Sequence, residues 1–392
     1  MLVTRRDLLW GSLALPVLAA KKPAPARPNL VLILVDALPC WMLGVYGNRE
    51  VRTPNIDRLA NAGTRLLSAF ACAPVADLSR ASLLTGRTPM QLGTAGITAA
   101  DVTLEKLFSG AGYACQSTED AAAAGEFVSR QSEGTPFFLT FHHTGLRPPY
   151  EGIAKKYLDL YSTQNFADYS VERAAPNVQE GKEMLADRVS NWRKVAAGVS
   201  ALDDQVGGLL AKVYQKQWID RTLVIFSGTA GALLGRRGLW GGGEASDPVN
   251  MFDEVVKIPT IWNWPGQVPA QATPVELVSA YDLLPSLCDA FDLTVPARNL
   301  CGRSYLPLAT GKRFPKKQPW RTTVFAQYKN TAMARDNRYK LVLRNEGKGP
   351  NELYDLPADS GERANQAEND QYLGVKNTLS AALAKWKQQF AG

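Results

Sequence analysis

The sequence has few of the residues from which metal centres are usually built. It contains only two histidines, adjacent to each other at His142 and His143. None of its five cysteines stands in a CxxC pair. A zinc site of histidines or of paired cysteines is therefore not expected. The cysteine spacing is compatible with one or two disulfides, best between Cys288 and Cys301, and equally with buried free thiols.

The chain also lacks a strong charge and a long apolar run. Its formal net charge is +7 over 392 residues, without a basic cluster. This argues against nucleic acid as a partner and mildly favours anionic ligands. No segment has the roughly 20 consecutive apolar residues that a membrane-spanning helix needs. A hydrophobic content of 45% is nevertheless enough for a large core.

The N-terminal residues are typical of an export signal. Within residues 1–20, the pair Arg5 and Arg6 precedes a short apolar run that ends in small residues. Residues 21–28 are rich in proline and lysine, as in a linker. We interpret 1–20 as a twin-arginine-type signal peptide and expect a periplasmic or otherwise extracytoplasmic protein. The alternative is an amphipathic first helix of the fold.

Apolar segments that alternate with helical patterns predict the main fold. Three continuous apolar runs that end in polar or small residues are typical of buried parallel strands: 29–37, 136–143 and 222–231. Two segments have helical apolar spacing: 53–63 and 192–215. We expect an α/β fold with a central, mostly parallel sheet flanked by helices. The site should lie where the strands end.

The pattern of apolar and polar residues changes in the C-terminal part of the sequence. Short alternating stretches with turn residues between them predict strands near 321–328, 339–344 and 351–356, followed by a helix at 371–390. This pattern indicates a small antiparallel C-terminal subdomain. We therefore expect an α/β domain over 29–315 and a second subdomain over 316–392.

Several segments together resemble the sulfatase family of the alkaline-phosphatase superfamily, of the iduronate and aryl sulfatase type. They occur in the family's order: PNLVLILVDALPCWMLGVYGN, TPNIDRLANAGTRLLSAFACAPVADLSRASLLTGRTP, TPFFLTFHHTGLRPPY, LDDQVGGLLAKV, TLVIFSGTAGALLGRRGLWG and ELYDLPADSGERANQAEND. The resemblance implies an alkaline-phosphatase-like sandwich. It also implies hydrolysis of sulfate esters by an aldehyde hydrate made from the first residue of C/S-x-P-S-R, beside a calcium ion.

The residues that this chemistry needs are largely replaced. The nucleophile position aligns with Ala76, whose methyl group can neither be oxidised to the aldehyde nor attack sulfur. Of the implied calcium ligands only Asp36 remains, while Ala37, Thr229 and Ala230 occupy the other three positions. One carboxylate does not supply the six to eight oxygens that calcium takes. No cofactor is therefore expected.

The positively charged donors of the implied pocket are replaced as well. The family's lysine and histidine positions align with Asp120, Ala122, Gly145 and Gly242. Apart from Asp36, Arg80 is clearly retained, with Ser79 beside it in the sequence.

A weaker anion site remains conceivable in the sequence. Arg80, His142 and His143 are candidate anion-binding residues, with Arg147 nearby. The alternative for the histidines is local hydrogen bonding at the end of a strand. The alternative for Arg80 is a structural ion pair with Asp36.

Three hypotheses follow. The first is an exported, catalytically inactive sulfatase-like protein that binds a sulfated or other glycan, or a partner protein. The second is an active sulfuric or phosphate ester hydrolase whose site is rewired with acidic residues, among Asp77, Glu119, Asp120, Glu244 and Asp247. The third is a subunit that stabilises or regulates a genuine sulfatase. Fold resemblance alone does not choose among them.

Overall fold

The computed structural model describes residues 27–315, 317–344 and 349–391. The expected signal peptide and most of the linker lie outside these ranges. No helix among the described residues is both long enough and apolar enough to cross a membrane.

The centre of the molecule is a six-stranded, mostly parallel sheet with the order β2-β7-β6-β1-β5-β4. Its strands are β1 Asn29–Val35, β2 Thr64–Leu66, β4 Ala114–Thr118, β5 Phe137–His143, β6 Thr222–Gly228 and β7 Thr260–Asn263. β4, β5, β1 and β6 pair in parallel, whereas β7 runs antiparallel to both β6 and β2. The expected α/β fold with a mostly parallel sheet is confirmed.

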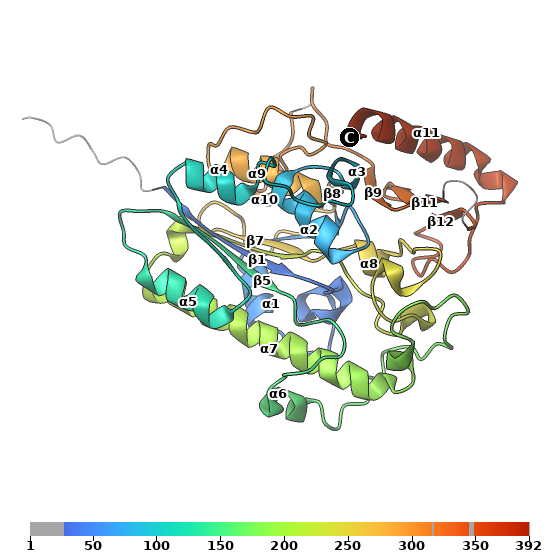
Figure 1. Cartoon of the computed structure of the whole chain (residues 1–392), viewed down its shortest axis with the longest axis horizontal. Helices are drawn as coiled ribbons and strands as arrows, with labels where there is room; N and C mark the ends of the chain where they lie inside the picture. The colour runs from blue at the N-terminus through green and yellow to red at the C-terminus, as the bar shows by residue number, and fades with distance from the viewer. Residues whose placement is uncertain (1–26, 316, 345–348, 392) are drawn as a thin grey trace, which may run out of the picture.

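Helices cover both faces of this sheet (Figure 1). On one side lie α1 Pro54–Asn61, α5 Ala121–Arg130, α6 Lys155–Leu160 and α7 Arg188–Gln215. On the other lie α2 Ala76–Thr85, α4 Leu104–Gly110, α9 Leu283–Ala290 and α10 Leu306–Ala309. Every residue of β1 is buried, because alternate side chains enter the two opposite cores.

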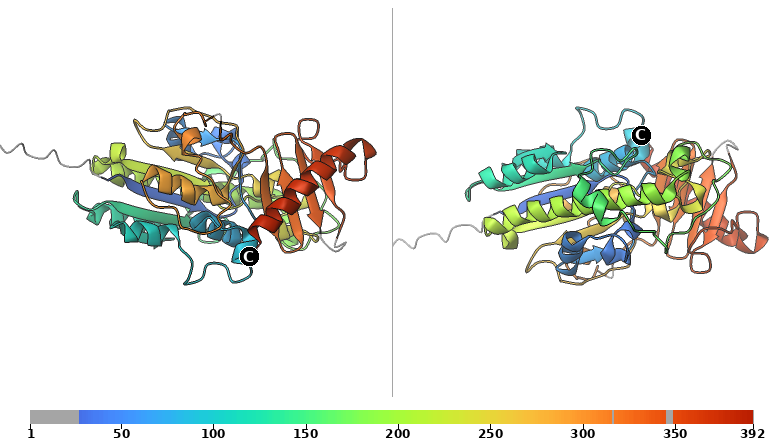
Figure 2. Two further views of the ribbon diagram at one scale, coloured as in Figure 1. Left: turned by 90° about the horizontal axis from the view of Figure 1, so that it is seen from above. Right: turned by 90° about the horizontal axis from the view of Figure 1, so that it is seen from below.

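A smaller antiparallel sheet forms the C-terminal part of the structure (Figure 2). Its strands are β9 Val324–Tyr328, β10 Thr331–Arg335, β11 Tyr339–Arg344 and β12 Glu352–Asp355. Helix α11 Leu373–Phe390 packs on this sheet, where Trp386 stacks on Phe325 with ring centroids 5.2 Å apart. β10 was not predicted because all five of its residues are buried, which removes the alternation that marks a half-exposed strand.

Short elements connect these layers. They include α3 Pro89–Leu92, α8 Asp253–Val256 and the two-stranded parallel pair β3 Ala69–Phe70 and β8 Val278–Ser279. The segment after β1 forms the 3-10 helix η1 Cys40–Met42, and the loop after β6 contains η5 Arg236–Gly238.

The cysteines are all free thiols, so the proposed Cys288–Cys301 bond is wrong and the alternative of free thiols holds. The Sγ atom of Cys301 instead accepts a hydrogen bond from the indole nitrogen of Trp386 at 3.1 Å. Cys288 lies in the core on α9, where burial raises the pKa of its thiol to about 11.

Candidate functional site

The carboxyl ends of three parallel strands bring the first candidate residues together. Asp36 follows β1, His142 lies at the end of β5 and Thr229 follows β6. The backbone holds this register, since the Asp36 amide donates to the carbonyl of His143 at 3.0 Å and the Thr229 amide donates to that of Val35 at 2.9 Å. The site therefore lies at the sheet edge that the sequence predicted.

Asp36 is the centre of this site and is completely buried. Its Oδ1 atom accepts hydrogen bonds from Thr229 Oγ1 at 2.6 Å and from His142 Nε2 at 3.0 Å. Its Oδ2 atom accepts from Arg147 Nη2 at 2.5 Å. Both oxygens are thus held by protein donors.

These donors keep the carboxylate ionised despite its burial. Burial by itself would raise the pKa of Asp36, but the hydrogen bonds from His142 and Thr229, together with the charges of His142 and Arg147, outweigh it. The net pKa is lowered below its ordinary value.

The two arginines of the site are engaged by the same acids. The expected pair between Arg80 and Asp36 is present at 3.7 Å, although Arg147 lies closer to that carboxylate. Arg80 Nη1 also lies 2.9 Å from Nδ1 of His142, the ring nitrogen that can accept when Nε2 donates to Asp36. Each arginine places an Nη2 atom 3.3 Å from Asp77 Oδ1. Their charges are therefore shared with internal partners.

His143 does not join this group. Neighbouring strand residues point to opposite faces, so its ring lies away from His142. The ring lies against Gly145, where an added Cβ atom would approach it to 3.0 Å. Burial, helped by the charge of His142, lowers the pKa of His143. The roles of Arg80, His142 and His143 in anion binding stay predictions.

The positions at which family residues are missing gather around one cavity of about 430 Å³, which we call the cleft. Four of them line it: Ala37, Ala76, Ala230 and Gly242. The charged side chains that line it are Asp77, Arg147, Glu180, Glu183 and Glu244. The cleft thus has methyl groups and backbone at its vacated positions, and acids outnumber cations among its lining side chains.

The residues present do not fit the calcium ion of the family. Asp36 is the single carboxylate retained from the implied ligand set, and both of its oxygens already accept from protein donors, including a guanidinium group. Two arginines within 4 Å of that carboxylate would repel a divalent cation. Within the described ranges, no three histidine, cysteine, aspartate or glutamate residues are grouped as metal ligands.

The other acids named from the sequence have local roles. Asp120 caps α5, because its Oδ1 atom accepts from the Ala122 amide at 2.7 Å. Glu119 lies 3.5 Å from the Nδ1 atom of His142. Glu244 accepts hydrogen bonds from Tyr328 and Lys329, and these contacts outweigh its burial and lower its pKa. Asp36 and Glu244 therefore both have a lowered pKa, whereas a general acid needs a raised one.

A wider cavity of about 770 Å³ adjoins the cleft and shares Val75, Asp77 and Glu244 with it. It contains Arg80 and Lys329 as cations, and its apolar surface comes from Met90, Ile97 and Tyr328, among others. Sequence reasoning missed this cavity because α2, α3, the following loop and β9 contribute to it from distant parts of the chain.

Comparison with known proteins agrees with this architecture. Residues 28–119 match the family described as Sulfatase, and residues 245–389 match the family described as N-sulphoglucosamine sulphohydrolase, C-terminal. The chain is 24% identical to a Delta 4,5-hexuronate-2-O-sulfatase of Bacteroides thetaiotaomicron, over 93% of this chain and 89% of that one. It is 41% identical to mouse steryl-sulfatase over 107 residues, which is 24% of this chain but only 17% of that protein.

Solved structures share the fold at low sequence identity. A protein solved in complex with its substrate D-glucosamine-2-N,6-O-disulfate superposes with a TM-score of 0.79 at 19% identity, covering 93% of this chain and 98% of that one. The phosphonate monoester hydrolase of Agrobacterium radiobacter superposes with a TM-score of 0.78 at 20% identity, covering 93% and 96%. Sequence and fold together establish that the chain is a member of the sulfatase family of the alkaline-phosphatase superfamily.

Proposed function

We propose that this chain is a catalytically inactive member of the sulfatase family that acts by binding a glycan, another anion or a partner protein. The observation that carries the proposal is the cleft itself. Ala76, Ala37 and Ala230 surround it at the positions of the nucleophile and of two metal ligands. A methyl group offers neither a lone pair to attack sulfur nor an oxygen to hold calcium.

The remaining polar residues do not replace what is missing. Catalysis of ester hydrolysis needs fixed donors aimed at the charge that develops in the transition state. Arg80 and Arg147 are the cations nearest the cleft, and both already pair with Asp36 and Asp77. Binding without turnover is the activity that such a site supports.

The adjoining cavity suits a ligand of sugar size. Its volume of about 770 Å³ lies within the usual range for ligand pockets, roughly 300 to 1,000 Å³. Arg80 and Lys329 would donate to a sulfate group there in exchange for their contacts with Asp77 and Glu244, while Met90 and Tyr328 offer apolar surface to a sugar ring. This agrees with the disulfated glucosamine bound by a protein of the same fold.

The proposal includes export. A signal peptide over 1–20 and a linker over 21–28 would deliver the α/β domain, 29–315, and the C-terminal subdomain, 316–392, to the periplasm. A sulfated glycan from outside the cell would meet the protein there.

The alternative is an active sulfuric or phosphate ester hydrolase with a rewired site. It is favoured by the names of the relatives, which are sulfatases, and by the phosphonate monoester hydrolase among proteins of the same fold. A subunit that supports a genuine sulfatase is a form of the partner role, and co-purification with such an enzyme would favour it.

The test is hydrolysis of aryl sulfates and aryl phosphates by the purified protein, with and without calcium, beside the variant Arg80→Ala. We expect no rate above that of the variant under any condition. A calcium-dependent rate that Arg80→Ala lacks would overturn the proposal in favour of the rewired hydrolase.

Binding is measured separately by calorimetry with D-glucosamine-2-N,6-O-disulfate and with D-glucosamine as the unsulfated reference. We expect Arg80→Ala to weaken binding of the sulfated sugar. If the unaltered protein and Arg80→Ala bind the sulfated sugar with equal affinity, the adjoining cavity is not the glycan site.

A further inference from the structure

A third cavity has a volume of about 460 Å³. We call it the basic cavity. It is lined from the segment after β1, from η5, from α8 and the residue after it, and from the ends of β10 and β12. It shares no lining residue with the cleft or with the cavity that adjoins the cleft.

Charged side chains of both signs line the basic cavity. The cations are Arg236, Lys257 and Arg335, and the acids are Asp253 and Glu254. Whether the cavity attracts an anion depends on which of these charges are already paired.

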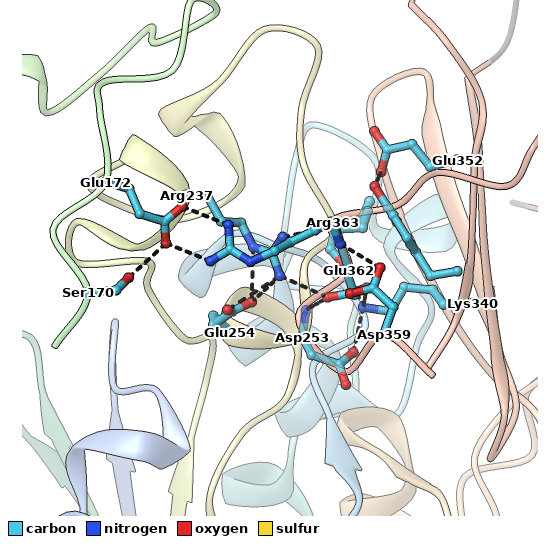
Figure 3. A network of polar contacts seen from close by, with 12 residues as sticks. Ser170, Glu172, Arg237, Asp253, Glu254, Lys340, Glu352, Asp359, Glu362 and Arg363 are labelled. Atoms are coloured by element: carbon cyan, nitrogen blue, oxygen red, sulfur yellow. Dashed lines mark hydrogen bonds and ion pairs between the residues drawn. The ribbon is translucent and has the colours of Figure 1, made fainter. Parts of the chain in front are cut away.

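Both acids face other cations (Figure 3). Glu254 Oε2 lies 3.2 Å from Arg237 Nη2. Asp253 Oδ1 lies 2.5 Å from the Nζ atom of the buried Lys340, and its Oδ2 lies 3.3 Å from Arg335. Although both acids line the cavity, their negative charges are therefore paired within a network of cations.

The network is balanced. Its third acid, the buried Glu362, lies 2.5 Å from Lys340 Nζ and 3.6 Å from Arg237 Nη2. Three carboxylates thus face three cations: Asp253, Glu254 and Glu362 against Arg237, Arg335 and Lys340. These six groups therefore carry no net charge among themselves.

Arg236 and Lys257 carry two further positive charges, which are not part of this network. Across the part of the chain that the structure describes, neither has a carboxylate oxygen within 4.0 Å or a side-chain hydrogen bond. The Arg236 guanidinium lies over the ring of Trp41, 4.1 Å from its centroid. Burial lowers the pKa of Arg236, and the charges of Glu254 and Glu172, which act in the opposite direction, do not outweigh it.

Two buried donors at the cavity also lack acceptors among the described residues. They are the indole Nε1 of Trp41 and the Nε of Arg335, a side chain that is only 8% exposed. Buried donors are rarely left without a partner, and a bound acceptor would satisfy these two. The Oδ1 atom of Asp253 on the same wall also lacks a hydrogen bond, but it is engaged in the ion pair with Lys340.

We propose that the basic cavity binds an oxyanion, a sulfate or phosphate group carried by a small molecule. Arg236 supplies a planar fork of donors and Lys257 a point charge, the pair of groups that proteins use for such anions. The Trp41 indole would donate a further hydrogen bond. The volume leaves room for a group about as large as a sugar ring beside the anion.

The test is titration of the purified protein at low ionic strength with sodium sulfate and with sodium phosphate, against sodium chloride at matched ionic strength. Calorimetry gives the affinity. The indole N–H signal of Trp41, assigned with Trp41→Phe, reports the place of binding by NMR. We expect saturable binding of sulfate, phosphate or both, with movement of that signal. Arg236→Gln and Lys257→Gln should each weaken binding about tenfold.

The matched control is Arg221→Gln, because Arg221 stacks on Trp218 in the same manner, 4.6 Å from its centroid, away from the cavity. It should bind as the unaltered protein does. Absence of saturable binding, an unmoved Trp41 signal, or equal affinity after both substitutions would overturn the proposal. Melting temperatures without anion show whether each variant is folded. If Arg236→Gln does not fold, the binding affinity of Lys257→Gln decides the test.

Discussion

The cleft and the basic cavity both contain arginines, but their charges are paired in opposite ways. At the cleft and the cavity that adjoins it, Arg147 and Arg80 are held by Asp36 and Asp77. At the basic cavity, the acids are held by other cations, and Arg236 and Lys257 are left over. The charged residues that line a cavity therefore do not predict its ligand until their pairing is known.

The difference also shows how a buried carboxylate is stabilised by protein donors alone. A buried carboxylate without its metal would be costly, and Asp36 is stabilised by Thr229, His142 and two arginines instead. Arg80 and Arg147 thus stabilise the fold through their ion pairs with Asp36.

The largest expected effect comes from breaking the network at the basic cavity. Lys340→Met leaves the buried Glu362 and the partly buried Asp253 without their closest cation. The free energy of unfolding should fall by about 3 to 5 kcal/mol, as for other broken buried ion pairs. Urea denaturation measures it.

The control is Lys155→Met, which breaks an ion pair between exposed residues, Lys155 and Asp159. It should change the unfolding free energy by no more than about 0.5 kcal/mol. If the two substitutions cost the same, the network at the basic cavity does not hold its acids as described.

A smaller loss is expected at the cleft. Asp36→Asn removes a buried charge that holds Arg147 and His142, and should cost about 1 to 3 kcal/mol at pH 7. Asp77→Asn is the matched control, since Asp77 contacts the same two arginines but its side chain is 71% exposed. It should have little effect, and an equal loss in both variants would contradict the central place of Asp36.

The same variant predicts a dependence on pH. Because the folded pKa of Asp36 is lowered, its contribution is present above its ordinary value of 3.8 and is lost as pH falls through the folded value. The stability difference between the protein and Asp36→Asn should therefore shrink below about pH 4. A difference that stays constant down to acid unfolding would contradict the assignment.

The smallest effect concerns the backbone of the cleft. Ala37 has a φ of 56°, in the left-handed region that disfavours residues with a Cβ atom. Ala37→Gly should raise the unfolding free energy by up to about 1 kcal/mol. Ala62→Gly, where φ is −87°, should lower it instead, and the pair of melting temperatures checks the sign. A fall in both would show that the conformation at Ala37 is not strained.

Much of the fold could be predicted from the sequence, because β1, β5 and β6 are long apolar runs and α7 has a clear helical period. β10 could not, since its burial hides the alternation. The short strand β2, of three residues, carries too little pattern to be recognised.

The candidate site divides in the same manner. The sequence predicted Ala37, Ala76 and Ala230 to be replaced positions, which stays a prediction, and the structure places all three residues at one cleft. The pairing of the charged side chains could not be predicted from the sequence. That Arg147 rather than Arg80 lies closest to Asp36, and that Arg236 has no carboxylate partner among the described residues, follow from side chains that meet only in three dimensions.

The most direct measurement is a calcium titration of the purified protein by isothermal calorimetry, with Asp36→Asn beside it. If the charges of the cleft are satisfied by one another, neither protein gives a saturable isotherm at millimolar calcium, and calcium does not shift the melting temperature. A saturable isotherm that Asp36→Asn lacks would show that the cleft still holds the metal, contradicting its description as a vacated site.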